Sequence, residues 1–115
     1  MTSPLKGKPM SEDDLLRAVL DLAKLYGWRS FHARPAMTAK GYRTAVSGDG
    51  KGWPDLILLK DADLLAIELK RDGAKATVEQ QMWLEAFSLV ALDATVWRPA
   101  DWNDGSILAV LSGQP

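Results

Sequence analysis

The sequence predicts an α/β fold in which helices flank a central mixed β-sheet, in the order α-β-β-β-α-β-α. Three observations lead to this prediction. Two apolar segments, Trp53–Lys60 and Leu64–Lys70, follow one another with a short connection, as in a hairpin of buried strands. A helical apolar stripe precedes them, and a second helical segment follows them. Strands that alternate with helices in this way are typical of a sheet covered by helices.

Length and composition limit the classes of protein to which the chain can belong. Its 115 residues suffice for one core, so we expect a flexible arm over residues 1–10 and a single domain over residues 11–115. The absence of cysteine excludes disulfides and thiolate metal sites. Apolar runs are too short to span a membrane, and we expect a cytoplasmic protein. The net charge of −1 requires any phosphate-binding surface to be local.

The first helix is expected to begin at Ser11 and to end near Gly27. Ser11 is a suitable N-cap with Asp14 three residues later, and glycine is a common residue just after a helix. Apolar residues then recur at helical spacing, at Leu15, Val19, Leu22, Ala23 and Tyr26. A first strand follows at about Trp28–Arg34, which Pro35 ends.

The segment from Pro35 to Gly52 is rich in glycine, threonine and serine and predicts a long loop. A loop of this length within a compact domain is either functional or disordered, and the sequence leaves both possibilities open. If it is functional, its basic residues would contact a nucleic-acid backbone; these are Lys40, Arg43 and Lys51.

The central hairpin carries charges where core residues are expected. Side chains alternate between the two faces of a strand, so Glu68 and Lys70 share one face of their strand. Pairing across a connection of three residues, 61–63, brings Asp55 of the first strand close to both. Two carboxylates beside an ammonium group suit a divalent metal site. The alternative is a solvated surface pair, although the apolar strands favour burial, and a buried carboxylate needs a partner.

The remaining elements are a helix, a strand and a short final helix. The helix is expected at about Thr77–Leu92, with a core stripe of Trp83, Phe87, Val90 and Ala91. Gln80 either points toward the sheet or forms a capping box with Thr77. The strand is expected at Thr95–Arg98, and an apolar helix near Ser106–Leu111.

Several motifs resemble a known nuclease family. They are, in chain order, Gly52-x-Pro54-Asp55, Ala66-Ile67-Glu68-Leu69-Lys70 and Glu79-Gln80-x-x-Trp83. Together they resemble the VRR-NUC (virus-type replication-repair nuclease) branch of the PD-(D/E)XK superfamily, in particular small stand-alone phage and prophage proteins. The stretches LAKLYGW, HARPA, GDGKGWPDL and VWRPADW are also similar to that branch, so the resemblance covers about residues 11–111.

The resemblance implies roles for individual residues. Asp55 and Glu68 would bind Mg²⁺, with Mn²⁺ as a possible substitute, together with the backbone carbonyl of Leu69. Lys70 would assist the attacking water, and Gln80 would complete the site. An acid on the first helix often joins such sites, and Glu12 fits best, with Asp14 as the alternative. DNA contacts are expected from basic residues, namely Arg34, Lys40, Arg43, Lys51 and Lys75.

The implied function is a metal-dependent DNA endonuclease that acts on branched DNA, as Holliday-junction resolvases do, in phage replication, recombination or repair. Because such a junction is two-fold symmetric, we expect the enzyme to be a homodimer. The alternatives are a flap or nicking nuclease, and a DNA-binding or assembly module without catalysis. His32, the only histidine, is expected to have a structural or phosphate-binding role. Packing, at a subunit interface or within the chain, is expected of Trp97, Arg98, Pro99 and Trp102.

Overall fold

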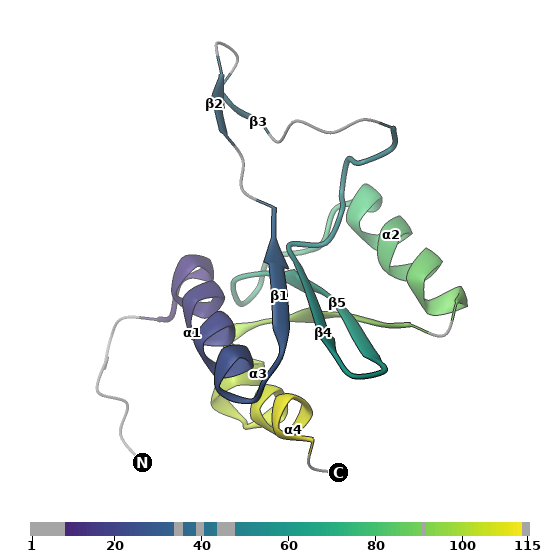
Figure 1. Ribbon diagram of the computed structural model, residues 1–115. Helices are drawn as coiled ribbons and strands as arrows, with labels where there is room; N and C mark the ends of the chain where they lie inside the picture. The colour runs from purple at the N-terminus through teal and green to yellow at the C-terminus, as the bar shows by residue number, and fades with distance from the viewer. Residues whose placement is uncertain (1–8, 34–35, 39–40, 44–47, 91, 114–115) are drawn as a thin grey trace.

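A computed structural model describes residues 9–33, 36–38, 41–43, 48–90 and 92–113, with the backbone alone for 36–38 and 41–43. Its main feature is a four-stranded mixed sheet in the order β1-β4-β5-β6 (Figure 1). The strands are β1 (Arg29–His32), β4 (Leu56–Lys60), β5 (Asp63–Leu69) and β6 (Asp93–Trp97). The first three are antiparallel neighbours, and β6 runs parallel to β5. The predicted α/β class with a central mixed sheet is confirmed.

Helix α1 (Glu12–Leu25) begins as the sequence predicts. Ser11 and Asp14 form a reciprocal capping box, in which the Ser11 hydroxyl accepts a hydrogen bond from the Asp14 N–H. The helix ends at a Tyr26 cap, and Gly27 follows with a φ of 83°. Residues 1–8 of the predicted arm lie outside the described residues, whereas Met10 packs against the core and is part of the folded domain.

The central hairpin is tighter than predicted. β4 and β5 pair from Leu56 opposite Ile67 to Lys60 opposite Asp63, so the turn contains two residues rather than three. Asp61, the first of these, has a φ of 52°, a conformation that aspartate tolerates better than most residues. Residues 65–69 of β5 are all buried, because this strand lies inside the sheet and both of its faces are covered.

The helices lie on both sides of the sheet (Figure 1). α1 shares one side with α3 (Pro99–Asn103) and α4 (Ser106–Ser112), and α2 (Val78–Leu89) packs on the other side against β5 and β6. The core lies between the sheet and the first group of helices. Its buried members come from α1, β4, β5, β6 and α4 and from the residue before β1, namely Leu15, Val19, Ala23, Trp28, Leu56, Leu58, Leu65, Ile67, Leu69, Trp97, Ile107 and Leu111.

The structure corrects three further sequence predictions. The segment predicted as a loop contains a small antiparallel hairpin, β2 (Ala36–Thr38) with β3 (Gly41–Arg43), because local strand pairing satisfies backbone groups that a loop leaves to solvent. α3 was not expected, and Pro99 begins it because its fixed φ suits the first helical position. Val90 is 70% exposed instead of core, because α2 ends at Leu89 and Val90 is its C-cap.

Candidate active site

Asp55 lies just before β4, and the backbone of β5 holds its side chain. Continuing the β4–β5 register places Asp55 opposite Glu68. The Leu69 N–H donates a hydrogen bond of 2.9 Å to Asp55 Oδ2. This contact fixes the carboxylate against the sheet and leaves its second oxygen to face other groups.

Glu68 is the buried acid of this site. Its exposed fraction is 2%, and its Oε1 atom is buried and accepts no hydrogen bond from the part of the chain that the structure describes. Burial, reinforced by the nearby charge of Asp55 and opposed by Lys70, raises the pKa of Glu68 to about 8. A solvated surface pair is therefore wrong for this residue. An orphaned oxygen on a buried acid is a ligand position that a cation would satisfy.

Lys70 directly follows β5 and points back to this acid. Its Nζ lies 3.5 Å from Glu68 Oε2, and its side chain is 15% exposed. The Lys70 N–H donates to the Trp97 carbonyl oxygen of the neighbouring strand at 3.1 Å. Asp55, Glu68 and Lys70 are thus brought together as the alternation of the strands predicts.

Glu12 lies at the edge of the group. Partial burial and then the charge of Asp55 raise the pKa of Glu12, and Lys70 opposes this shift, which places the carboxyl within electrostatic reach of both. Asp14 is engaged elsewhere, by the Ser11 cap and by Arg17 at 3.1 Å. Within the described ranges, no three acidic or histidine side chains converge as a metal cluster. The carboxylate pair alone still fits Mg²⁺, which usually takes one or two carboxylates and keeps several waters.

Gln80 forms the capping box that the sequence offered as its alternative role. Its Oε1 accepts a hydrogen bond of 2.8 Å from the Thr77 N–H, and the Gln80 N–H donates to the Thr77 hydroxyl at 3.1 Å. The side-chain oxygen of Gln80 is therefore used to begin α2. A role for Gln80 in the site stays a prediction.

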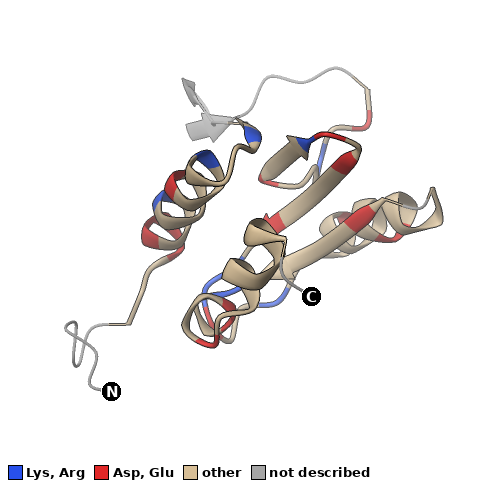
Figure 2. Ribbon diagram, turned by 60° about the horizontal axis from the view of Figure 1, so that its bottom comes forward, with Lys and Arg blue, Asp and Glu red and all other residues tan. Residues whose placement is uncertain are grey.

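Of the five basic residues expected to contact DNA, two have side chains that the structure describes. Arg34 and Lys40 lie outside the described residues, as does the side chain of Arg43. Lys75 is exposed, and Lys51 lies 3.8 Å from Glu79 with its side chain 83% exposed. Figure 2 shows acidic and basic residues interspersed along α1.

The residues expected to be structural lie on β1 and where β6 passes into α3. His32 is half-buried on the edge strand β1, and its role stays a prediction. Trp97 and Pro99 are buried, and the Arg98 guanidinium donates to the Ala74 carbonyl at 2.9 Å. These residues connect the end of β6 to the segment that follows Lys70, so a packing role within the chain is confirmed for them.

The sequence did not single out the contact that seats the Asp55 segment on α2. Gly52 has a φ of 85°, and a Cβ atom there would lie 2.5 Å from the backbone carbon of Glu79. Trp53 packs edge-to-face on Trp83, with ring centroids 5.0 Å apart. The Gly-x-Pro-Asp motif was the available signal, because a glycine before a fixed site often marks a close backbone approach.

Comparisons with known proteins give no match: no family model, curated protein or solved structure resembles the chain significantly. Among the described residues, no helix has the length and apolarity needed to cross a membrane.

Proposed function

We propose that this chain is a divalent-metal-dependent endonuclease that hydrolyses phosphodiester bonds in DNA. The observation that carries the proposal is Glu68, a buried acid with an unpartnered oxygen between Asp55 and Lys70. A buried acid with an unpartnered oxygen destabilises a fold, and functional sites are where proteins retain such groups. The resemblance to VRR-NUC proteins assigns the same three residues to catalysis.

In this proposal the acidic residues bind the metal ion and Lys70 assists the reaction. Asp55 and Glu68 would hold Mg²⁺ or Mn²⁺, with the Leu69 carbonyl as a further ligand by family resemblance, and Glu12, whose pKa responds to the charge of Asp55, would act through water. A bound divalent ion supplies activation of water and stabilisation of charge on the phosphate. Lys70 places a positive charge next to the reacting group and can donate hydrogen bonds to an attacking water or a phosphate oxygen.

The proposed substrate is branched DNA, and the proposed active species is a homodimer. A four-way junction has two strands to cut in symmetric positions, which two copies of one site can reach together. Sedimentation analysis should give twice the 12.6 kDa mass of one chain. A purely monomeric species that cuts junctions would overturn the dimer.

The decisive experiment compares a labelled four-way junction, a flap and a linear duplex, each with Mg²⁺, with Mn²⁺ and with a chelator. Lys70→Ala should lower metal-dependent cleavage by about a hundred-fold or more, as loss of one charge-stabilising donor does in other enzymes. Lys24→Ala is the matched control, since Lys24 is an exposed lysine at the far end of α1 and should retain full cleavage.

The outcomes separate the rival functions. Paired, metal-dependent cuts on the junction support the resolvase-like nuclease, and cuts that ignore DNA shape support the chemistry but overturn the substrate. Folded wild-type protein that binds DNA and cuts none of the three substrates would favour a catalytically silent DNA-binding module.

A further inference from the structure

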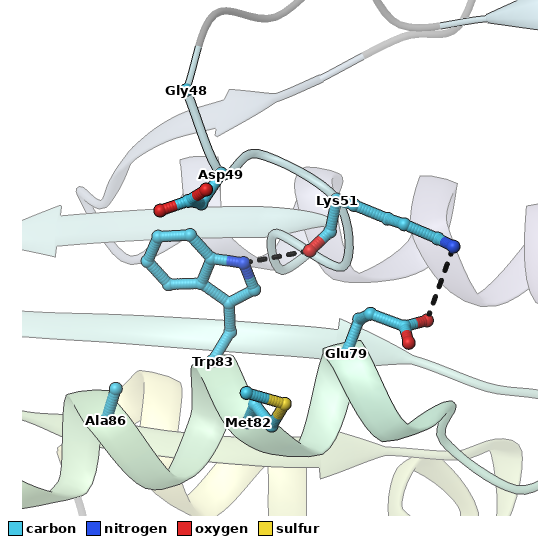
Figure 3. A pocket seen from close by; sticks show the side chains of 7 residues that line it. All are labelled: Gly48, Asp49, Lys51, Glu79, Met82, Trp83 and Ala86. Carbon is cyan, nitrogen blue, oxygen red and sulfur yellow. Dashed lines mark hydrogen bonds and ion pairs between the residues drawn. The ribbon is translucent and has the colours of Figure 1, made fainter.

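A hollow lies on the outer side of the Gly52 contact, between α2 and the segment that precedes β4. It has a volume of about 550 Å³ and is lined mainly by Asp49, Lys51, Glu79, Met82 and Trp83. Figure 3 shows the indole of Trp83 facing this hollow, with Asp49 on one side of the ring and Met82 on the other. This size is within the range of sites that hold small organic groups, roughly 300–1,000 Å³.

The floor of the hollow is a flat aromatic surface held in one orientation. The Trp83 indole N–H donates a hydrogen bond of 2.9 Å to the Lys51 carbonyl oxygen (Figure 3). The ring also packs against Trp53 and Phe87, with ring centroids 5.0 Å and 5.8 Å away. Met82 beside it is 63% exposed. A fixed, half-buried indole that lines a hollow suits the stacking of another planar ring.

The polar rim selects the kind of planar group. Among the described lining residues, Asp49 and Glu79 contribute two carboxylates, and the single ammonium group, that of Lys51, lies 3.8 Å from Glu79. This balance disfavours a phosphate and favours a group that donates hydrogen bonds to carboxylates. The exocyclic amino groups of nucleobases are such donors, and acidic side chains pair with them in known protein–DNA contacts.

The hollow is also close to the candidate active site. Lys51 precedes Asp55 by four residues, so their Cα atoms are at most about 14 Å apart. Trp53 connects the two places directly, since it contacts Trp83 and is followed by Pro54 and Asp55. A DNA strand with its phosphate at Asp55 can therefore place a nearby nucleotide at Trp83.

We propose that this hollow is a subsite for one unstacked nucleobase, which stacks on Trp83 and donates an amino hydrogen bond to Asp49 or Glu79. The inference rests on the proposed nuclease function and adds how the enzyme engages single-stranded or distorted regions of its substrate. Stacking tolerates every base, and the carboxylates favour adenine and cytosine over thymine.

The test measures binding of fluorescent single-stranded 12-mers of dA, dC and dT, and of an abasic 12-mer, to the full-length chain without divalent ions. The wild type should bind dA and dC more tightly than dT, and the abasic strand most weakly. Trp83→Leu should weaken binding of dA and dC by about five- to a hundred-fold, the usual effect of losing one stacked base. Trp83→Phe keeps a ring and should stay within about three-fold of the wild type.

Controls separate loss of the subsite from loss of the fold. Asp49→Asn removes a rim charge and should reduce the preference over dT, whereas Asp63→Asn, at the exposed end of the β4–β5 turn, should leave it unchanged. Thermal unfolding followed by circular dichroism identifies variants that are folded. A folded Trp83→Leu protein with wild-type affinity, or equal binding of the abasic strand, would overturn the subsite.

The cleavage assay distinguishes failure of this inference from failure of the proposed function. A wild type that cuts DNA while Trp83→Leu changes nothing overturns the subsite alone. A wild type that binds bases at Trp83 but never cuts DNA overturns the nuclease and supports the binding site.

Discussion

Replacing Glu68 with glutamine should stabilise the metal-free protein at alkaline pH. The wild-type carboxyl is 2% exposed, and burial and the charge of Asp55 raise its pKa from 4.5 to about 8. Glutamine has the same size and cannot ionise. The substitution therefore removes the cost of a buried charge without opening a cavity.

The sign and size of the effect follow from proton linkage. A carboxyl with a higher pKa in the folded than in the unfolded state binds more protons when folded, so stability falls as pH rises from about 4.5 towards 8. Each pKa unit corresponds to about 1.4 kcal/mol, which gives an upper limit of about 5 kcal/mol for Glu68. Only about 3.5 kcal/mol of this limit falls between pH 5 and pH 8, and entry of water or counter-ions reduces it further, so we expect a loss of about 2–3 kcal/mol over this range.

Urea denaturation in the presence of a chelator measures the difference. Glu68→Gln and the wild type should have similar free energies of unfolding at pH 5, and the variant should be more stable by about 2–3 kcal/mol at pH 8. Glu85→Gln, the same substitution at an exposed position of α2, should follow the wild type at both pH values. A Glu68→Gln variant that is less stable than the wild type at pH 8 would refute a buried, ionisable Glu68. An equal loss of unfolding free energy in both proteins between pH 5 and pH 8 would refute it as well.

Two further outcomes test the site and its support. Mg²⁺ or Mn²⁺ at about a hundred times its Kd should stabilise the wild type at pH 8 by about 2.7 kcal/mol in the same urea experiment, and should leave Glu68→Gln unchanged. Gly52→Ala should lower the free energy of unfolding by about 2 kcal/mol or more, because the new methyl group would meet the Glu79 backbone at 2.5 Å with φ at 85°. Gly73→Ala, with a φ of 81° and open space around its Cβ, should lose only about 1 kcal/mol; equal losses in the two variants would contradict the contact.

The fold was predictable where local patterns agree with the tertiary structure. The alternation in β4 and β5, and the Ser11 and Thr77 caps, depend on near neighbours in sequence, and each is found in the structure. α2 was harder to predict, because its apolar residues do not mark a buried face. None of its residues, all of which the structure describes, is fully buried. Its half-buried aromatic residues, Trp83 and Phe87, pack on Trp53 instead.

The candidate site was predictable in its centre and not at its edge. The strand period places Glu68 and Lys70 on one face, and the two-residue turn, one residue shorter than predicted, sets the register that brings Asp55 opposite Glu68. The position of Glu12 and the hydrogen-bond partner of the Gln80 side chain depend on how α1 and α2 begin and pack against the sheet. For Gln80 two local interactions competed, and the capping box uses its side-chain oxygen.

The burial of Glu68 also indicates how the site is organised. An apolar residue at position 68 would avoid the free-energy cost of burying an ionisable group, and the residues on either side of it in β5 are apolar. The Leu69 N–H occupies one oxygen of Asp55, and Lys70 lies near one oxygen of Glu68, so each acid has one oxygen engaged by the chain. The orphaned Oε1 of Glu68 is the position where the chain offers no partner among its described residues. A divalent cation at this position would satisfy that atom and favour the ionised acid, so binding of the metal would offset the stability that the buried carboxylate costs.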